Sequence, residues 1–200
     1  MPGKELSTAV ASEVTVCTKC QLWKTRKNAV PGEGGARSKI MFVGEAPGRS
    51  EDAQGRPFVG AAGKFLDELL SEIGVPREDV FITNVVKCRP PRNRAPKSSE
   101  VQACTAYLDR QMRIIKPKFI VTLGNYATAY IFSKAKLPFD GITLVHGKPH
   151  KATILSMKVI VFPMFHPATA LYNPKYKAIL RQDFQSLKDE VERTFHSRKS

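Results

Sequence analysis

Short hydrophobic runs, each followed by a residue typical of loops, recur along the chain. Within a run the hydrophobic residues are consecutive instead of alternating with polar ones, which is the pattern of strands buried on both faces of a parallel sheet. The runs are residues 40–43, 80–83, 119–123 and 159–162, and we expect them to form the sheet. In chain order they are followed by Gly, Asn, Gly and Pro.

Segments with helical spacing separate and follow these runs. The first ends before Gly74, which we expect to terminate that helix. Ser99 and Gln102 predict a capping box for the second, and a third begins near Asn125. Three of the predicted helices have a recognisable hydrophobic face. It consists of Phe65, Leu66, Leu69, Leu70 and Ile73 in the first helix, of Val101, Cys104, Leu108, Met112 and Ile115 in the second, and of Tyr176, Leu180, Phe184, Leu187 and Val191 in the last helix of the chain. Strands alternating with helices predict an α/β fold, a three-layer α/β/α sandwich.

The residues directly after the strands are the first candidates for a site, because α/β folds bind ligands beyond the carboxyl ends of their strands. They are residues 44–48 (Gly-Glu-Ala-Pro-Gly), Asn84, residues 124–125 and residues 163–167. Side chains from these segments are therefore expected to meet at one edge of the sheet.

The composition adds a strong positive charge to this picture. A chain of 200 residues with 42% hydrophobic and 25% charged side chains fits one globular domain over residues 1–200 and argues against disorder. The 32 Lys and Arg against 18 Asp and Glu leave a net charge of +14, and the pI is about 9.8. Such a surface attracts polyanions, so nucleic acid is the leading class of partner.

Neither a membrane anchor nor an export signal is visible in the sequence. No stretch approaches the roughly 18 apolar residues that span a bilayer. Residues 1–14 lack the basic segment, apolar core and cleavage site of a signal peptide. We therefore expect a cytoplasmic protein with no membrane partner, in which the four cysteines stay reduced.

These four cysteines are candidate metal ligands. Cys17 and Cys20 form a C-x-x-C pair before the first strand, Cys88 follows the second strand, and Cys104 lies in the next helix. The spacing is not that of a local zinc finger, and four thiolates suit either zinc or an iron–sulfur cluster. Buried structural cysteines are the alternative.

Four features near the strand ends can serve a ligand, and each also has a simpler structural explanation. The glycine-rich residues 44–48 can present backbone N–H groups or form only a tight turn. Phe58 can stack on a planar base or fill the core below its loop. Asn84 offers one acceptor and two donors to a nucleobase edge, although capping a turn is commoner. His166 is a catalytic candidate only together with other strand-end residues.

A loop after the second strand concentrates positive charge. Residues 87–97 hold five cations and no acid, and their prolines keep the backbone extended. We interpret this segment as one that follows nucleic-acid phosphates through Arg89, Arg92 and Arg94, and not as a merely solvated loop. The alternative cationic face consists of Lys134, Lys136, Lys148 and Lys151.

Taken together, these segments closely resemble the family 4 uracil-DNA glycosylases, the iron–sulfur kind found in thermophilic bacteria and archaea. The matching residues run in order from about Cys17 to Phe184. They are residues 44–48, residues 55–60 (Gly-Arg-Pro-Phe-Val-Gly), residues 83–85 (Thr-Asn-Val), the four cysteines and residues 166–168 (His-Pro-Ala). The resemblance implies a four-stranded parallel sheet between helices and removal of uracil from DNA. It also implies a [4Fe–4S] cluster on Cys17, Cys20, Cys88 and Cys104.

The resemblance gives each strand-end residue a role. Phe58 would stack on uracil, and backbone N–H groups around Glu45 and Ala46 would donate to its O2 oxygen. Asn84 would accept from N3–H and donate to O4, which leaves groups unpaired when cytosine is bound. His166 in its neutral form would donate to O2 while negative charge grows on the departing base.

One loop position departs from the better-known family 1 enzymes. There the second residue after the loop glycine, Gly44 here, is an aspartate that handles the water, whereas this chain has Ala46. Glu45 is our candidate for activating the water, because it is the nearest ionisable side chain. The resemblance places Glu51 beside C5 of the base, as a barrier to the thymine methyl group.

A side chain is also expected to fill the gap left by the flipped base. The residue four after the histidine, often leucine in relatives, is Ala170 here, so we assign the duplex wedge to Leu171 or Tyr172. We expect a monomer acting on uracil-containing DNA. A noncatalytic DNA-binding module with a structural metal site and a glycosylase of broader specificity are the competing interpretations.

Overall fold

A central sheet of five strands organises the molecule, for which the computed structural model describes residues 2–196. The strands are β1 (Ile40–Gly44), β2 (Phe81–Asn84), β3 (Phe119–Leu123), β4 (His150–Ile154) and β5 (Met157–Met164). Their order across the sheet is β2-β1-β3-β5-β4. The four hydrophobic runs predicted as strands are β1, β2, β3 and β5, and these four are mutually parallel.

The expected four-stranded parallel sheet is wrong in one respect, because a fifth strand makes the sheet mixed. Strand β4 pairs antiparallel with β5 and forms an edge. Its residues Lys151 and Thr153 are exposed, so the strand has no continuous hydrophobic run. An edge strand with one solvated face does not show the hydrophobic run that is typical of strands buried on both faces.

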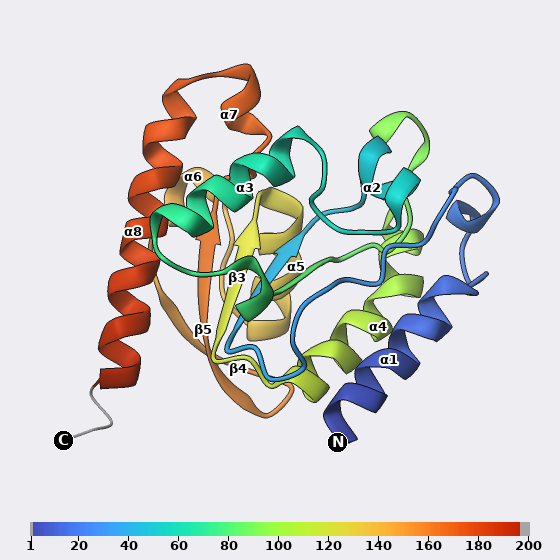
Figure 1. Cartoon of the computed structure of the whole chain (residues 1–200), viewed down its shortest axis with the longest axis horizontal. Coiled ribbons are helices and arrows are strands. Elements are labelled where there is room, and N and C mark those ends of the chain that lie inside the picture. Colours follow the sequence, from blue (N-terminus) through green and yellow to red (C-terminus); the bar gives the residue numbers. More distant parts are fainter. Residues whose placement is uncertain (1, 197–200) are drawn as a thin grey trace.

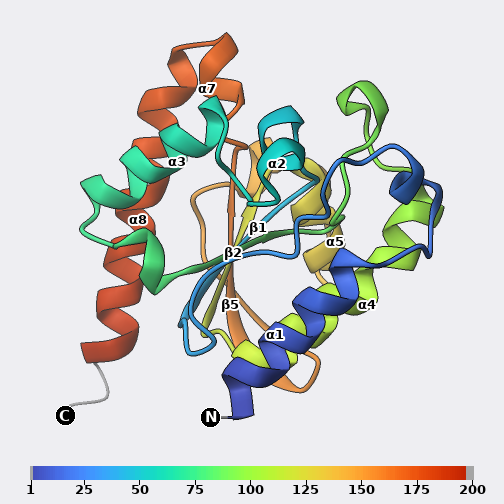
Figure 2. The same ribbon diagram turned by 45° about the vertical axis from the view of Figure 1, so that its right-hand side comes forward.

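Helices cover both faces of the sheet, which confirms the predicted layers (Figures 1 and 2). One face carries α1 (Pro2–Thr15), α4 (Ser98–Ile115) and α5 (Asn125–Ala135). The other carries α3 (Ala61–Glu72) and α8 (Lys175–His196). Alternate residues of each strand point to opposite faces: Met41 and Val43 belong to the first core, and Ile40 and Phe42 to the second.

Short helical segments connect the main elements. Three of them, α2, η3 and α7, come after the carboxyl ends of β1, β2 and β5, and α2 and α7 lie along the upper edge in Figure 1. The short segments are η1 (Gln21–Lys24), α2 (Arg49–Gln54), η2 (Arg77–Asp79), η3 (Pro91–Asn93), α6 (Ile142–Val145) and α7 (Thr169–Tyr172). This edge is where the sequence predicts the site.

The predicted end of α3 and the predicted start of α4 can be compared with the structure. Gly74 adopts φ of 73° two residues after the end of α3, which confirms it as a terminator. The capping box predicted from Ser99 and Gln102 is wrong, because the N-cap of α4 is Lys97, two residues before Ser99. The carboxylate of Glu100 instead accepts the Lys97 backbone N–H at 2.8 Å.

Helix α1 was not predicted from the sequence. It buries Val10 and Val14 against α4, and Glu13 forms an ion pair with Arg110 of α4. Thr8, Ala9, Ser12, Glu13 and Thr15 around these two positions are exposed, so the segment has no continuous hydrophobic run. In the described residues, no helix has the length and hydrophobicity to cross a membrane.

Candidate active site and cysteine centre

A cavity of about 320 Å³ opens at the carboxyl edge of the sheet, where β1, β2 and β5 end; we call it the strand-end cavity. Its walls include the backbone turn after β1, the end of β2 and the segment after β5. The lining residues are Glu45, Ala46, Pro47, Gly48, Glu51, Phe58, Ala62, Asn84, Pro90, Asn93, Arg94, His166 and Ala168. Six of the seven residues that the sequence assigns to the base pocket therefore come together here.

The seventh, Gly44, lies behind the wall and allows it to form. A Cβ atom at this position would collide with Oδ1 of Asn84 and lie 2.7 Å from Cζ of Phe58. Gly44 is paired with Asn84 in the parallel register of β1 and β2. A side chain at Gly44 would therefore push apart the two residues expected to hold the base.

Asn84 is the last residue of β2 and is 2% exposed. Its backbone is fixed by the sheet, and the next residue, Val85, donates its N–H to the Gly44 carbonyl at 2.9 Å. Within the part of the chain that the structure describes, the Asn84 side-chain amide makes no hydrogen bond. Buried amides are normally paired, so this one is ready for a ligand in the cavity.

Phe58 lies at the boundary between the core and the cavity. Its ring is 5% exposed and belongs to the core cluster that includes Phe65, yet it also lines the strand-end cavity. The backbone has φ of 49°, a left-handed conformation that is uncommon for an aromatic residue. The ring stacks with His166 at a centroid distance of 5.6 Å. An apolar ring face held in this way suits a flat ligand.

His166 is positioned as a neutral hydrogen-bond donor. Its Nδ1 accepts the backbone N–H of Ala168 at 3.1 Å, so the proton of the neutral ring is assigned to Nε2. Burial lowers the pKa of His166 to about 4, although Glu51 acts in the opposite direction. At neutral pH the ring is therefore uncharged. Gly124, with φ of 88°, makes room for it, since a Cβ there would lie 3.1 Å from that of His166.

Two carboxylates line the cavity in different environments. Glu51 accepts three backbone N–H groups, from Gly48 at 3.1 Å, Val59 at 2.9 Å and Gly60 at 2.8 Å, and so ties the start of α2 to the loop of Phe58. Burial raises the pKa of Glu45 above its ordinary value. A carboxylate with a raised pKa is a stronger base, which suits activation of a water molecule.

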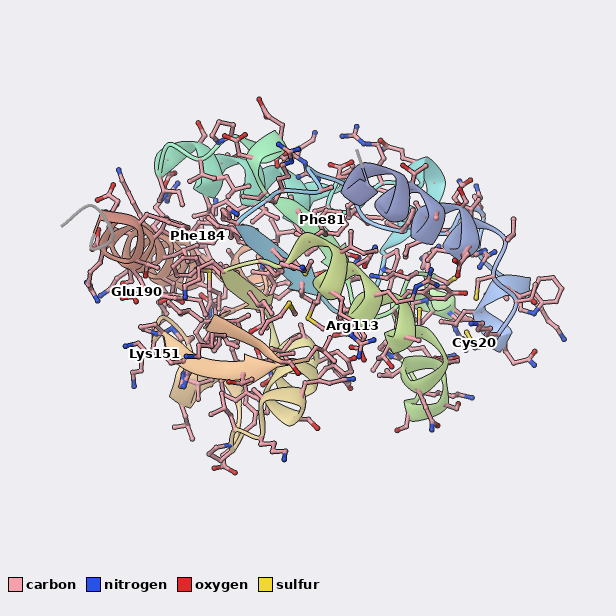
Figure 3. The ribbon with its side chains drawn as sticks, turned by 90° about the horizontal axis from the view of Figure 1, so that it is seen from below. Cys20, Phe81, Arg113, Lys151, Phe184 and Glu190 are labelled. Atoms are coloured by element: carbon pink, nitrogen blue, oxygen red, sulfur yellow. The ribbon has the colours of Figure 1, made fainter. Side chains whose placement is uncertain are left out.

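The four cysteines line one hollow on another side of the molecule; we call them the cysteine centre. Cys17 and Cys20 follow α1, Cys88 follows β2, and Cys104 belongs to α4. In Figure 3, seen from below, Cys20 lies across the molecule from Phe184 of α8. The sequence therefore identified a set of thiols that the fold gathers in space.

The hollow is lined by four cysteine sulfur atoms, two of which accept hydrogen bonds from N–H groups. The Arg26 side chain donates to Sγ of Cys88 at 3.0 Å, and the Lys87 backbone N–H donates to Sγ of Cys104 at 3.2 Å. Four sulfur ligands with N–H donors fit an iron–sulfur cluster. Among the described side chains, no group of three or more His, Cys, Asp or Glu is arranged around a single metal ion. In a cluster each thiolate binds its own iron, so the sulfur atoms need not converge on one point.

One of the five cations of the loop, Lys87, is buried, and another, Arg94, is paired with a carboxylate. Lys87 is 1% exposed and points into the core, so it is not a surface charge. Arg94 makes two hydrogen bonds to the Glu100 carboxylate, at 2.7 and 2.8 Å. Arg92 is exposed, and Arg89 donates to the Asn93 side chain at 2.7 Å. Arg89 and Arg92 are thus the arginines of the loop without a carboxylate partner in the described residues.

Two hydrophobic side chains are exposed on the segment after β5. Leu171 is 45% exposed and Tyr172 is 88% exposed, whereas Ala170 is 2% exposed. All three belong to α7, which begins one residue after Ala168 in the cavity wall. Leu171 and Tyr172 therefore stay the candidates for the predicted wedge.

Comparisons with known proteins assign the chain to a family. Residues 31–188 match the uracil DNA glycosylase superfamily. The type-4 uracil-DNA glycosylase of Saccharolobus solfataricus is 53% identical over 183 residues, 91% of this chain and 85% of that protein. That of Sulfurisphaera tokodaii is 56% identical over 90% of this chain and 82% of that protein. That of Archaeoglobus fulgidus is 48% identical over 89% of each. The chain therefore belongs to the uracil-DNA glycosylase superfamily and, within it, to the type-4 uracil-DNA glycosylases.

Proposed function

We propose that this protein removes uracil from DNA by hydrolysing the N-glycosidic bond, which releases free uracil and leaves an abasic site. The observation that carries the proposal is the convergence of Asn84, Phe58 and His166 in one strand-end cavity of about 320 Å³. Their chemistry matches a flat base with donors and acceptors on its edge. Membership of the type-4 family agrees with this assignment.

The buried Asn84 amide reads the base. Its oxygen accepts from N3–H of uracil, and its nitrogen donates to O4. Cytosine presents an acceptor at N3 and a donor at position 4, so both of its groups would face a like group of a fixed amide. Unpaired buried polar groups cost free energy, which gives selectivity against cytosine. The Phe58 ring supplies the stacking surface.

Cleavage is assisted by donors aimed at the departing base. As the glycosidic bond breaks, the base gains negative charge and the sugar gains positive charge. The Nε2–H of neutral His166 donates to O2, together with backbone N–H groups around Glu45 and Ala46. These donors are in place before the reaction, so no reorganisation is needed as the charge grows. Glu45 accepts a proton from the water that adds to the sugar.

The cysteine centre holds a [4Fe–4S] cluster in this proposal, with Cys17, Cys20, Cys88 and Cys104 as ligands. When bound, the cluster supplies a structural cross-link. Its ligands would come from the segment after α1, which also carries Arg26, from the segment after β2, which also carries Lys87, and from helix α4. Arg26 donates to a ligand sulfur and so offsets the negative charge of the thiolates.

DNA lies over the carboxyl edge of the sheet. Arg89 and Arg92 contact phosphates next to the strand-end cavity, and Leu171 or Tyr172 enters the space left by the flipped base. Glu51 blocks the thymine methyl group at C5, in addition to holding the Phe58 loop. The exposure of Arg92, Leu171 and Tyr172 on segments that flank the cavity supports this placement of the DNA.

The decisive experiment is a base-release assay on matched oligonucleotides that differ only in carrying uracil, thymine or cytosine at one position. Wild-type protein should release uracil and give alkali-cleavable strands, with little release from the thymine and cytosine strands. Asn84→Ala protein purified in parallel controls for a contaminating glycosylase. Binding of DNA without uracil release would instead identify a noncatalytic module, and comparable release of several damaged bases would identify a broader glycosylase.

A further inference from the structure

A buried lysine lies directly behind the base-reading residue. Lys87 is 1% exposed, and its ammonium group donates three hydrogen bonds. The acceptors are the Asn84 backbone carbonyl at 2.7 Å, Oγ1 of Thr83 at 2.6 Å and Oε1 of Gln111 at 2.7 Å. All three donors of the ammonium group are therefore used, and all three acceptors are neutral.

This arrangement joins the end of β2 to helix α4. Gln111 belongs to α4, and its Nε2 donates to the Pro31 carbonyl at 2.7 Å. Thr83 donates to the same Pro31 carbonyl at 3.1 Å. The backbone of Lys87 is fixed as well, because its N–H donates to Sγ of Cys104. Lys87 is thus held at both its main chain and its side-chain end.

These contacts lie next to Asn84, so we expect them to affect the position of this residue more than the stability of the fold. The Asn84 side chain makes no hydrogen bond within the described residues, so its direction depends on its backbone and on packing against Gly44 and Phe58. The Lys87 ammonium binds the carbonyl of that same residue. Burying an ammonium group is costly, and a hydrophobic side chain of similar length would fill the same space. A specific task for its three hydrogen bonds explains the presence of the lysine better than packing does.

We infer that Lys87 is a positioning residue, which holds the Asn84 peptide so that the side-chain amide meets the edge of the base. The inference rests on the proposed reading of uracil by Asn84. Lys87 does not touch the base. It acts through Asn84, so its contribution should exist only while Asn84 is present.

A double-mutant cycle tests this dependence. Lys87→Met keeps the length of the side chain but removes the three hydrogen bonds. In protein with Asn84 intact, it should lower the single-turnover rate of uracil release by about 10–100-fold, since small misplacements of a positioning group have effects of that order. In Asn84→Ala protein, Lys87→Met should change the remaining rate by less than about threefold, because coupled residues are not additive. DNA affinity and iron content should stay unchanged.

Two further variants separate positioning from general stability. Thr122→Val removes a buried hydrogen bond to Thr128 in another part of the core, so it should lower the melting temperature but leave uracil release unchanged. Thr83→Val removes one of the three acceptors and should give a smaller rate loss than Lys87→Met. It also serves as the test if Lys87→Met does not fold.

Two results would overturn the inference: a near wild-type rate for both Lys87→Met and Thr83→Val, or equal fold losses with and without Asn84. Failure of the proposed function would look different. In that case wild-type protein itself would release no uracil.

Discussion

The strand-end cavity and the cysteine centre are built in opposite ways. The cavity takes its side chains from the carboxyl ends of β1, β2 and β5 and from the loops that follow them, and backbone hydrogen bonds between β1 and β2 fix the register of Gly44 against Asn84. The cysteine centre takes its thiols from two loop segments and a helix. These meet through the packing of α1 on α4, and Cys17 and Cys20 lie outside the sheet altogether.

This difference predicts two kinds of mutational response. The sheet holds the cavity in shape without a ligand, so changes there should alter the chemistry and leave the fold intact. The cysteine centre links segments that the sheet does not hold, so changes there should weaken the fold first. The predictions below test this division, beginning with the largest expected effect.

Asn84→Asp should damage the chemistry most. The carboxylate keeps an acceptor for N3–H but loses the donor to O4 and repels the charge that grows on the base. Loss of one prearranged donor lowers rates by roughly 10²–10³, and the repulsion should bring the loss to the upper end of that range or beyond. Single-turnover excision measures it, and iron content and melting temperature should stay near wild type.

Selectivity gives this variant a second readout. Once the introduced carboxyl group of the Asn84→Asp protein is protonated it can donate a hydrogen bond, so cytosine release should appear only as the pH falls. His166→Ala is the control, because O2 is common to both bases; it should slow uracil release without any gain for cytosine. A near wild-type uracil rate in Asn84→Asp would remove Asn84 from the site.

Cys88→Ala should show the reverse response. Cys88 is 5% exposed and accepts a hydrogen bond from Arg26, so its loss opens the cysteine centre. Wild-type protein should be brown with about four irons per chain, whereas the variant should lose most of its iron and melt at a lower temperature. Its uracil release, measured below the melting temperature, should fall less than that of Asn84→Asp. Stoichiometric zinc in colourless, anaerobically prepared wild-type protein would contradict the cluster assignment.

The buried His166 in the cavity should lower the free energy of unfolding at acid pH. Burial lowers the pKa of His166 from 6.5 to about 4, so between these values the unfolded chain binds more protons than the folded one. Stability should therefore fall as the pH drops from about 6.5 towards 4, by up to about 3 kcal/mol from this residue. Urea unfolding of wild type and His166→Gln at pH 7 and pH 4.5 measures it. Equal losses in both proteins would show that His166 titrates normally.

The fold was predictable where burial leaves a simple pattern. Strands β1, β2, β3 and β5 are hydrophobic throughout because both of their faces are covered, and the sequence located all four. Strand β4 and helix α1 each have exposed positions, such as Lys151 and Thr153 in β4, that break the pattern. Their places are decided by packing against elements distant in sequence, which periodicity does not report.

The site was predictable for a related reason. Parallel strands bring their carboxyl ends to one edge, so Asn84 and His166 were expected at the same edge, and both line the strand-end cavity although β1 and β3 lie between β2 and β5. Lys87 was taken for a surface cation, and the pairing of Arg94 with Glu100 was not predicted, because a sequence shows charge but not its partner. The hydrogen bonds from Lys87 to Gln111 and from Arg94 to Glu100 are visible only in the structure. In the sequence, only the short separation of Asn84 and Lys87 along the chain indicates that Lys87 lies near the cavity.

The smallest effect concerns the loop that joins the two regions, since residues 87–97 lead from the strand-end cavity past Cys88 towards Cys104. Arg89→Ala with Arg92→Ala removes the two arginines that have no carboxylate partner in the described residues and leaves the Arg94–Glu100 pair intact. Log K for DNA should fall linearly with log salt in wild type, and the slope should become shallower by about 2 in the double variant, because each phosphate contact contributes about 0.9.

Lys136→Ala with Lys151→Ala removes the same charge from exposed positions at the end of α5 and on the edge strand β4, where Figure 3 marks Lys151. If the loop is the phosphate contact, this control should leave the slope unchanged. A shallower slope in the control and not in the arginine variant would move the DNA to the β4 side. Because phosphate contacts carry no sequence information, the ratio of uracil to cytosine release should stay the same in both variants. A changed ratio in the arginine variant would mean that the loop also shapes the strand-end cavity, to which Pro90, Asn93 and Arg94 contribute.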